Sequence, residues 1–260
     1  MKWIKYIAAF AGILALFLAY IGYFSPFDFE YIPATETPAP DKADLAAVIL
    51  SGDMGLNIGM GPQIAKRLAA DGIPVIGVNS ITFFRNKRSP KEVELLVNGA
   101  TREALKFGKA KQVILIGQSF GADMLPVGLA GMPAELRAKV RMVGLVVPTD
   151  TLYFRASPSE MFNWSKPDGE ALPYSRKLTW VPTICIFGAE ESASLCPALK
   201  QPNVHRVVLP GGHPLHRDAD AVHNELSAAI DDTAPSASHI TKMSGDAHAA
   251  DTMAALNSKY

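Results

Sequence analysis

The sequence predicts an α/β fold in which a mostly parallel sheet of about six strands is covered by helices on both faces. Two observations support this class. Short apolar runs alternate with amphipathic segments between residues 45 and 230, and most of these runs are continuously apolar. Such strands are typical of a parallel sheet that is buried on both faces. Right-handed crossovers then connect the strands, and ligands bind at their carboxyl ends.

The predicted elements follow in chain order. Strands are expected at six runs: residues 45–50, 74–78, 113–116, 142–147, 183–187 and 204–209. Helices are expected over residues 61–71, 89–108 and 119–130. The second helix opens with Ser89, Pro90 and Glu92, which form a capping box with proline at the first helical position. Alternation of this kind predicts one domain of ordinary size over residues 44–231.

The N-terminus has the pattern of a membrane segment. Lys2 and Lys5 precede an uncharged apolar run at residues 6–24. At about 1.5 Å per helical residue, this run approaches the hydrocarbon thickness of about 30 Å. We expect an N-terminal transmembrane helix within residues 1–24. A cleaved secretory signal is the alternative, but the bulky residues after the run make a poor cleavage site.

The flanking segments fix the expected orientation and the domain limits. No Lys or Arg follows the span before Lys42, so the N-terminus is expected in the cytoplasm and the rest of the chain outside it. Residues 25–43 are rich in proline and are expected to form a linker. Residues 232–260 are small and polar and are expected to be a disordered tail.

Two further features bear on the compartment and on the partners. In an oxidising compartment Cys185 and Cys196 could form a disulfide, and two separate buried thiols are the alternative. The 25 basic and 25 acidic side chains cancel, so no overall field favours a nucleic-acid partner.

A pentapeptide that follows the third strand carries the strongest functional signal. Gly117, Ser119 and Gly121 give the pattern Gly-x-Ser-x-Gly, directly before a predicted helix. A strand that turns into a helix through this pattern forms a nucleophile elbow, which exposes the serine hydroxyl above the sheet. An ordinary glycine-flanked turn is the alternative. The context of strand, pattern and helix favours Ser119 as a nucleophile.

A serine hydroxyl needs a base, and the base needs an orienting acid. His213 follows the last strand on a pair of glycines and is the expected base, with His216 as the nearest rival. Three carboxylates can complete the triad. Glu191 and Glu190 follow the fifth strand, and Asp150 follows the fourth.

The oxyanion of an acyl-transfer reaction needs two backbone donors. Phe120 follows the nucleophile and is expected to supply one N–H group. Met54 or Asp53 is expected to supply the other from the loop after the first strand. Asp123 lies one helical turn past Ser119, so it either faces the site as a substrate-binding group or lies on the helix surface.

The order Ser, acid, His is the order used by α/β-hydrolases. Three pieces of the chain also resemble the VirJ/AcvB family of bacterial virulence proteins: residues 50–53, residues 117–123 and residues 209–213. The resemblance covers about residues 44–230. It implies a periplasmic α/β-hydrolase that cleaves the ester of aminoacylated phosphatidylglycerol, notably the lysyl form. It also implies a link to virulence and type IV secretion.

These observations together predict an exported serine hydrolase, anchored in the inner membrane, with lysyl-phosphatidylglycerol as substrate. Asp53 is the expected carboxylate for a cationic aminoacyl head, and the chemistry needs no metal or organic cofactor. A small lid, or none, is expected, and the aromatic-rich residues 151–180 form either a lid or a packed loop. The alternatives are another periplasmic esterase or lipase, and a non-enzymatic adaptor that holds type IV secretion components.

Overall fold

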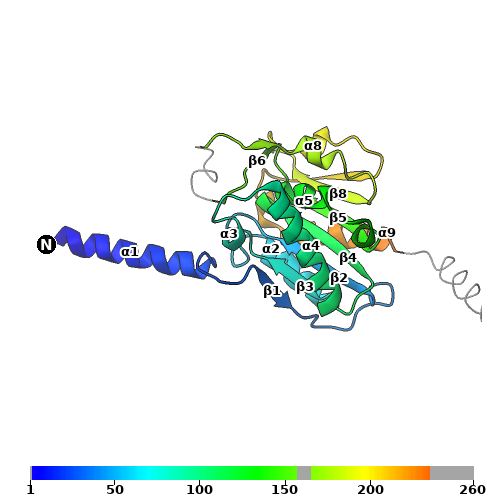
Figure 1. Cartoon of the computed structure of the whole chain (residues 1–260), viewed down its shortest axis with the longest axis horizontal. Coiled ribbons are helices and arrows are strands. Elements are labelled where there is room, and N and C mark those ends of the chain that lie inside the picture. The colour runs from blue at the N-terminus through cyan, green and yellow to red at the C-terminus, as the bar shows by residue number, and fades with distance from the viewer. Residues whose placement is uncertain (1, 157–164, 235–260) are drawn as a thin grey trace, which may run out of the picture.

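A seven-stranded sheet forms the centre of the structure, which is a computed structural model describing residues 2–156 and 165–234 (Figure 1). The strands lie in the order β1-β3-β2-β4-β5-β8-β9. Their bounds are β1 Phe29–Ile32, β2 Leu45–Leu50, β3 Val75–Val78, β4 Gln112–Gln118, β5 Val140–Val146, β8 Thr183–Gly188 and β9 Val204–Leu209. All neighbours pair in parallel except β1 and β3. The predicted fold class is thereby confirmed.

Helices cover both faces of this sheet, and strand residues alternate between the two layers. In β2, Val48 and Leu50 belong to a core shared with α4 (Pro90–Phe107) and α5 (Phe120–Ala130). Ile49 belongs to a second core, shared with α2 (Gly61–Ala70) and α9 (Ala219–Asp232). Burial of both faces explains why the inner strands β2 and β3 are apolar throughout, whereas the edge strands β1 and β9 carry exposed polar residues.

The helix ends follow from local capping. Ser89 accepts a hydrogen bond from the Glu92 N–H group, and the Glu92 carboxylate accepts one from the Ser89 N–H group, as the capping box predicts. Asp218 caps α9 by accepting from the Ala221 N–H group. The shorter helical pieces are α3 Ser80–Phe83, α6 Ala134–Arg137, α8 Leu172–Ser175, η1 Cys196–Ala198 and η2 Leu215–Arg217.

The segment expected as a linker contains a strand. Residues of β1 pair antiparallel with β3, Phe29 opposite Val78 and Ile32 opposite Val75. The expectation of a plain spacer over residues 25–43 is therefore wrong for residues 29–32. An edge strand pairs through its backbone along one side only, so it does not need the continuous apolar pattern of a central strand. The sequence pattern consequently missed it.

The insertion between β5 and β8 packs onto the domain where the structure describes it. It contains the two-stranded pair β6 (Thr151–Leu152) and β7 (Gly169–Glu170), followed by α8. Leu152, Phe154 and Ala156 are buried in the core beside α4 and α5. Met161, Phe162 and Trp164 of the aromatic-rich stretch lie outside the described residues. Most of the expected tail, residues 235–260, also lies outside them.

A long helix, α1 (Lys2–Tyr20), projects away from the rest of the protein beside α3 (Figure 1). Among the described residues it is the one helix long and apolar enough to cross a membrane, over Trp3–Tyr20 with a mean hydropathy of 1.8. None of that span is buried against the protein. A signal sequence has the same features.

Candidate active site

Ser119 occupies a sharp turn between the end of β4 and the start of α5. Its backbone has φ 53° and ψ −123°, a conformation that is strained for a residue with a side chain. The flanking glycines make the turn possible. A Cβ atom on Gly117 would lie 2.4 Å from the Gly121 carbonyl oxygen, and one on Gly121 would lie 2.2 Å from the Leu50 carbonyl oxygen. Only glycine fits at both positions, and this is the geometry of a nucleophile elbow.

The imidazole of His213 lies against this serine. Ser119 Oγ and His213 Nε2 are 2.8 Å apart, although 94 positions separate the two residues in the sequence. His213 lies in the loop that follows β9. In the described part of the chain, no hydrogen bond links the rival His216 to Ser119. The His216 ring instead packs beside Gly211.

Glu191 is the carboxylate that contacts the imidazole. Its Oε1 atom lies 2.5 Å from His213 Nδ1, and its Oε2 atom accepts a hydrogen bond from the Gly188 N–H group. The loops after β8 and β9 touch closely: a Cβ atom on Gly188 would lie 2.3 Å from the Gly211 carbonyl oxygen. Only 6% of the Glu191 side chain is exposed, so its contact with the histidine is largely shielded from solvent.

A disulfide closes the loop that carries this glutamate. Cys185 in β8 and Cys196 in η1 are bonded, with Cα atoms 5.6 Å apart and a sequence separation of 11. Both residues are buried. The covalent link fixes both ends of the segment that contains Glu191.

The other two predicted acids lie elsewhere. Glu190 is exposed, and its backbone N–H group donates to the Gly211 carbonyl oxygen. Asp150 is also exposed and lies in the lining of the cavity beside the serine. Within residues 2–156 and 165–234, no hydrogen bond joins either carboxylate to His213. The geometry therefore selects Glu191 from the three candidates.

Asp123 is buried rather than on a helix surface. Its Oδ1 atom accepts from the Thr149 N–H group at 2.6 Å, and its Oδ2 atom lies 3.0 Å from the Thr149 hydroxyl. That hydroxyl also lies within 3.2 Å of the Thr151 carbonyl oxygen. Burial raises the pKa of Asp123 well above its usual value, and the Thr149 contacts offset only part of the rise. Asp123 thus ties α5 to the segment after β5 at the wall of the cavity.

The predicted oxyanion donors come from two segments, the start of α5 and the loop after β2. Phe120 begins α5, so no residue of that helix accepts from its N–H group. Asp53 and Met54 lie in the loop after β2. Burial raises the pKa of the Asp53 carboxyl, while the charge of His213 and the N–H groups of Asp53 and Met54 oppose the rise. The Asp53 carboxyl therefore lies close both to the imidazole and to the backbone donors assigned to the oxyanion.

A cavity of about 380 Å³ opens beside these groups. Its lining includes Ser119, His213, Asp53, Asp150 and Arg155. This volume lies within the usual range for sites that bind small molecules. Carboxylates and a guanidinium thus share the space next to the serine hydroxyl. Among the residues that the structure describes, no group of three or more His, Cys, Asp or Glu side chains could hold a metal ion.

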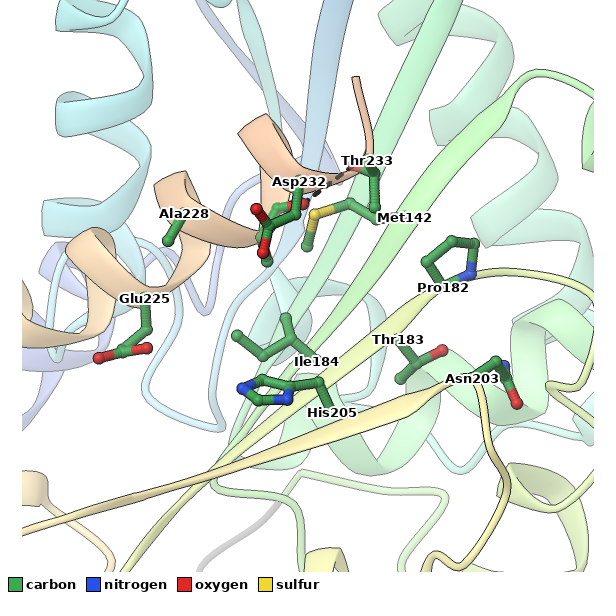
Figure 2. Close-up of a pocket in the computed structure, with 11 residues that line it drawn as sticks. Met142, Pro182, Thr183, Ile184, Asn203, His205, Glu225, Ala228, Asp232 and Thr233 are labelled. Atoms are coloured by element: carbon green, nitrogen blue, oxygen red, sulfur yellow. Dashed lines mark hydrogen bonds between the residues drawn. The ribbon is translucent and has the colours of Figure 1, made fainter. Parts of the chain in front are cut away.

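A second cavity, of about 150 Å³, lies at the opposite edge of the sheet (Figure 2). Thr183 and His205 line it at the amino ends of β8 and β9, and Glu225 lines it from α9. Ser119 lies at the carboxyl ends of the strands, so this cavity lies at the opposite end of the strands from the triad.

A comparison with protein families identifies the chain. The family described as "Bacterial virulence protein (VirJ)" matches residues 44–234. The chain belongs to the VirJ family. This match confirms the resemblance that the three sequence motifs indicated. The VirJ region contains every strand of the central sheet except β1, together with Ser119, Glu191 and His213. No curated protein matches the sequence.

Solved structures share the architecture of this VirJ-family chain. Est1E from Butyrivibrio proteoclasticus with ferulic acid bound is 14% identical, with a TM-score of 0.55 over 78% of this chain and 95% of that one. Proline iminopeptidase from Mycobacterium smegmatis is 13% identical, with a TM-score of 0.56 over 79% and 94% of the two chains. The esterase Pf2001 from Pyrococcus furiosus is 18% identical, with a TM-score of 0.51 over 78% and 90%. At these identities the comparison establishes the α/β-hydrolase fold.

Two residues of the VirJ-family site were not singled out from the sequence. Thr149 holds Asp123, and its position at the end of an apolar run is the signal that points to it. Arg155 lines the cavity from the segment after β6. Nothing in its sequence context marks it, because it belongs to no motif and a single arginine is usually a solvated side chain.

Proposed function

We propose that this protein is an exported serine hydrolase that cleaves the aminoacyl ester of lysyl-phosphatidylglycerol. One observation carries the proposal: an unbroken hydrogen-bonded series from Ser119 through His213 to Glu191, at the wall of a cavity lined by further carboxylates. The same arrangement on unrelated folds activates serine for acyl transfer. The fold and the family support it.

The geometry gives each group a role in the reaction. His213 Nε2 takes the proton of Ser119 Oγ as this oxygen attacks the ester carbonyl carbon. Glu191 holds the Nδ1 proton and stabilises the imidazolium. We assign the N–H group of Phe120, and one from the loop that carries Asp53 and Met54, to the developing oxyanion. His213 then protonates the departing glycerol oxygen, which releases phosphatidylglycerol and leaves lysyl-Ser119. Water, deprotonated by His213, hydrolyses this second ester and releases lysine.

The charges in the cavity fit a lysyl ester. Such an ester carries two ammonium groups. The lining offers two carboxylates, Asp53 and Asp150, that are not hydrogen-bonded to Thr149. The glycerol phosphate of the lipid carries a negative charge, and Arg155 lies in the same lining. Asp123 is engaged by Thr149, so we assign it to holding the wall of the cavity rather than to binding substrate.

The compartment is part of the proposal. The apolar helix α1, preceded by lysines, suits an inner-membrane anchor with the catalytic domain in the periplasm. The disulfide between Cys185 and Cys196 is suited to an oxidising compartment. A lipid substrate in the adjoining leaflet would reach Ser119 without leaving the membrane surface. Type IV secretion components remain proposed partners.

Two assays on the full-length protein test the proposal. A fluorophosphonate probe should label the wild type and Ser227→Ala, a control serine on α9, but not Ser119→Ala. Purified protein in mixed micelles should release free lysine from lysyl-phosphatidylglycerol.

Labelling without lysine release would favour another esterase on the same scaffold. Absence of labelling in the wild type, with capture of secretion components retained, would favour the adaptor.

A further inference from the structure

The residues at the end of α1 pack against the catalytic domain. Residues 20–25, called here the docking segment, lie against residues 52–57, the oxyanion loop, and against α3. The apolar side chains of α1 are largely exposed, whereas Ile21, directly after the helix, is only 2% exposed. Both contacted elements follow the carboxyl ends of strands, β2 and β3, and β2 lies next to β4, which ends just before Ser119.

A rigid cap ends the helix at this point. Gly22 has φ 85°, its N–H group donates to the Ala19 carbonyl, and the Tyr23 N–H group donates to the Leu18 carbonyl. This pair of bonds is a Schellman motif with glycine at the left-handed position. The chain therefore leaves α1 in a defined direction, without a flexible hinge.

Close packing leaves little room for a Cβ atom at Gly55 of the oxyanion loop or at Gly22 of the docking segment, and Asn79 lies beside both glycines. A Cβ atom on Gly55 of the loop would lie 2.6 Å from the Ile21 carbonyl oxygen and 2.8 Å from Asn79 Oδ1. A Cβ atom on Gly22 would lie 2.3 Å from Asn79 Nδ2. Asn79 is thus held between one glycine of the helix end and one glycine of the loop. Both glycines have positive φ angles.

Hydrogen bonds complete the contact. Asn57, at the far end of the oxyanion loop, donates from its side-chain amide to the Tyr20 carbonyl. Thr82 Oγ1 in α3 donates to the Gly22 carbonyl at 2.8 Å. Arg85 Nη1 donates to the Tyr23 carbonyl at 2.9 Å. The Asn57 bond satisfies a carbonyl group in the last turn of α1, and the other two bonds tie the residues after the helix to Thr82 and Arg85.

We propose that the docking segment is a positioning element that holds the oxyanion loop, so that an intact junction with α1 is needed for full turnover. The loop carries Asp53 and Met54, and the docking contacts lie one and three residues beyond Met54, at Gly55 and Asn57. Loss of the contact frees the loop and misplaces the Met54 donor. The inference rests on the proposed function, since it assigns a role in the same reaction.

A pair of glycine variants in the full-length protein tests it. Gly22→Val places a branched side chain at φ 85° and against the Asn79 amide, whereas Gly12→Val, within α1, meets no atom within 4 Å. Turnover is measured in micelles on a water-soluble ester, so that access to a lipid surface plays no part. We expect Gly22→Val to lower kcat about 10²-fold, the effect of losing one oxyanion donor, with KM little changed. Gly12→Val should match the wild type.

Hydrogen exchange provides a readout that does not depend on catalysis. Amides of residues 53–57 should exchange faster in Gly22→Val than in Gly12→Val, while those of β4 stay protected. If Gly22→Val also exposes β4, Thr82→Val, which removes one hydrogen bond to the docking segment, takes its place in both measurements. Unchanged kcat together with unchanged loop exchange would overturn the proposal. If the wild type hydrolyses no ester, the proposed function fails, and exchange alone decides whether the docking segment holds the loop.

Discussion

Glu191 Oε1 lies 2.5 Å from His213 Nδ1, whereas the neighbouring Glu190 points its side chain into solvent. The two glutamates therefore make a matched pair. Glu191→Gln should lower kcat by about 10³–10⁴-fold, because the amide cannot stabilise the imidazolium. Glu190→Gln should leave kcat within about twofold, as expected for a surface substitution. Steady-state kinetics on a soluble ester compares them, and equal losses in both variants would contradict the assignment.

Asp53 should distinguish a cationic ester from a neutral one. Asp53→Asn is expected to raise KM for lysyl-phosphatidylglycerol roughly tenfold, which corresponds to about 1.4 kcal/mol of a charge-assisted contact. A neutral soluble ester provides the control and should show little change in KM. Similar KM changes for both esters would place Asp53 outside the recognition of the ammonium groups.

The raised pKa of Asp53 also predicts a pH dependence of substrate binding. Only the ionised carboxylate attracts an ammonium group, and burial moves the pKa of this carboxyl above the usual value of an aspartate. KM for the lysyl ester should therefore increase as the pH falls through that raised pKa. Asp53→Asn should abolish this dependence, and a wild-type KM profile that is already flat in the acidic range would contradict it.

Asp123 should affect stability in a defined direction. Burial raises its pKa in the folded protein, so the folded state binds the proton more tightly than the unfolded chain. The free energy of unfolding should then fall as the pH rises from the usual aspartate pKa through the raised one. Asp123→Asn keeps an acceptor for the Thr149 N–H group and removes this slope, whereas Asp123→Ala lowers stability at every pH. Urea unfolding across the acidic range measures all three proteins.

The disulfide between Cys185 and Cys196 should stabilise both the fold and the acid. Its removal is expected to lower the free energy of unfolding by about 2–4 kcal/mol, and kcat should fall because Glu191 lies inside the closed loop. Wild-type protein with and without reductant shows the effect. The double variant Cys185→Ala with Cys196→Ala is the control, since reductant should not change its stability.

Much of the fold was predictable because burial leaves a direct record in the sequence. Strand β2 begins and ends where its buried apolar run does, and α4 starts at its capping box. The catalytic roles of Ser119 and His213 could also be predicted from the sequence, because Ser119 lies in the elbow pattern and His213 follows the last strand. Strand β1 could not be predicted from the sequence, because its pairing depends on backbone groups that any residue supplies.

The choice between Glu190 and Glu191 could not be made from the sequence. Both follow the same strand, and the local turn decides which of them faces inward. In that turn the Glu191 N–H group donates to the Gly188 carbonyl and the Glu190 N–H group donates to the Gly211 carbonyl of another loop. The contact between α1 and the loop after β2 likewise could not be predicted, because the two segments share no sequence pattern.

The rigid end of α1 at Gly22 has a consequence for the substrates that the protein can use. Figure 1 shows α1 leaving the domain beside α3; were this helix to span a bilayer, as proposed, the cap at Gly22 would hold the domain at a fixed distance from the membrane surface. Ser119 would then work at one height above the headgroups, set by the fold itself. Lipid esters would be selected by the depth at which their carbonyl lies as well as by their charge.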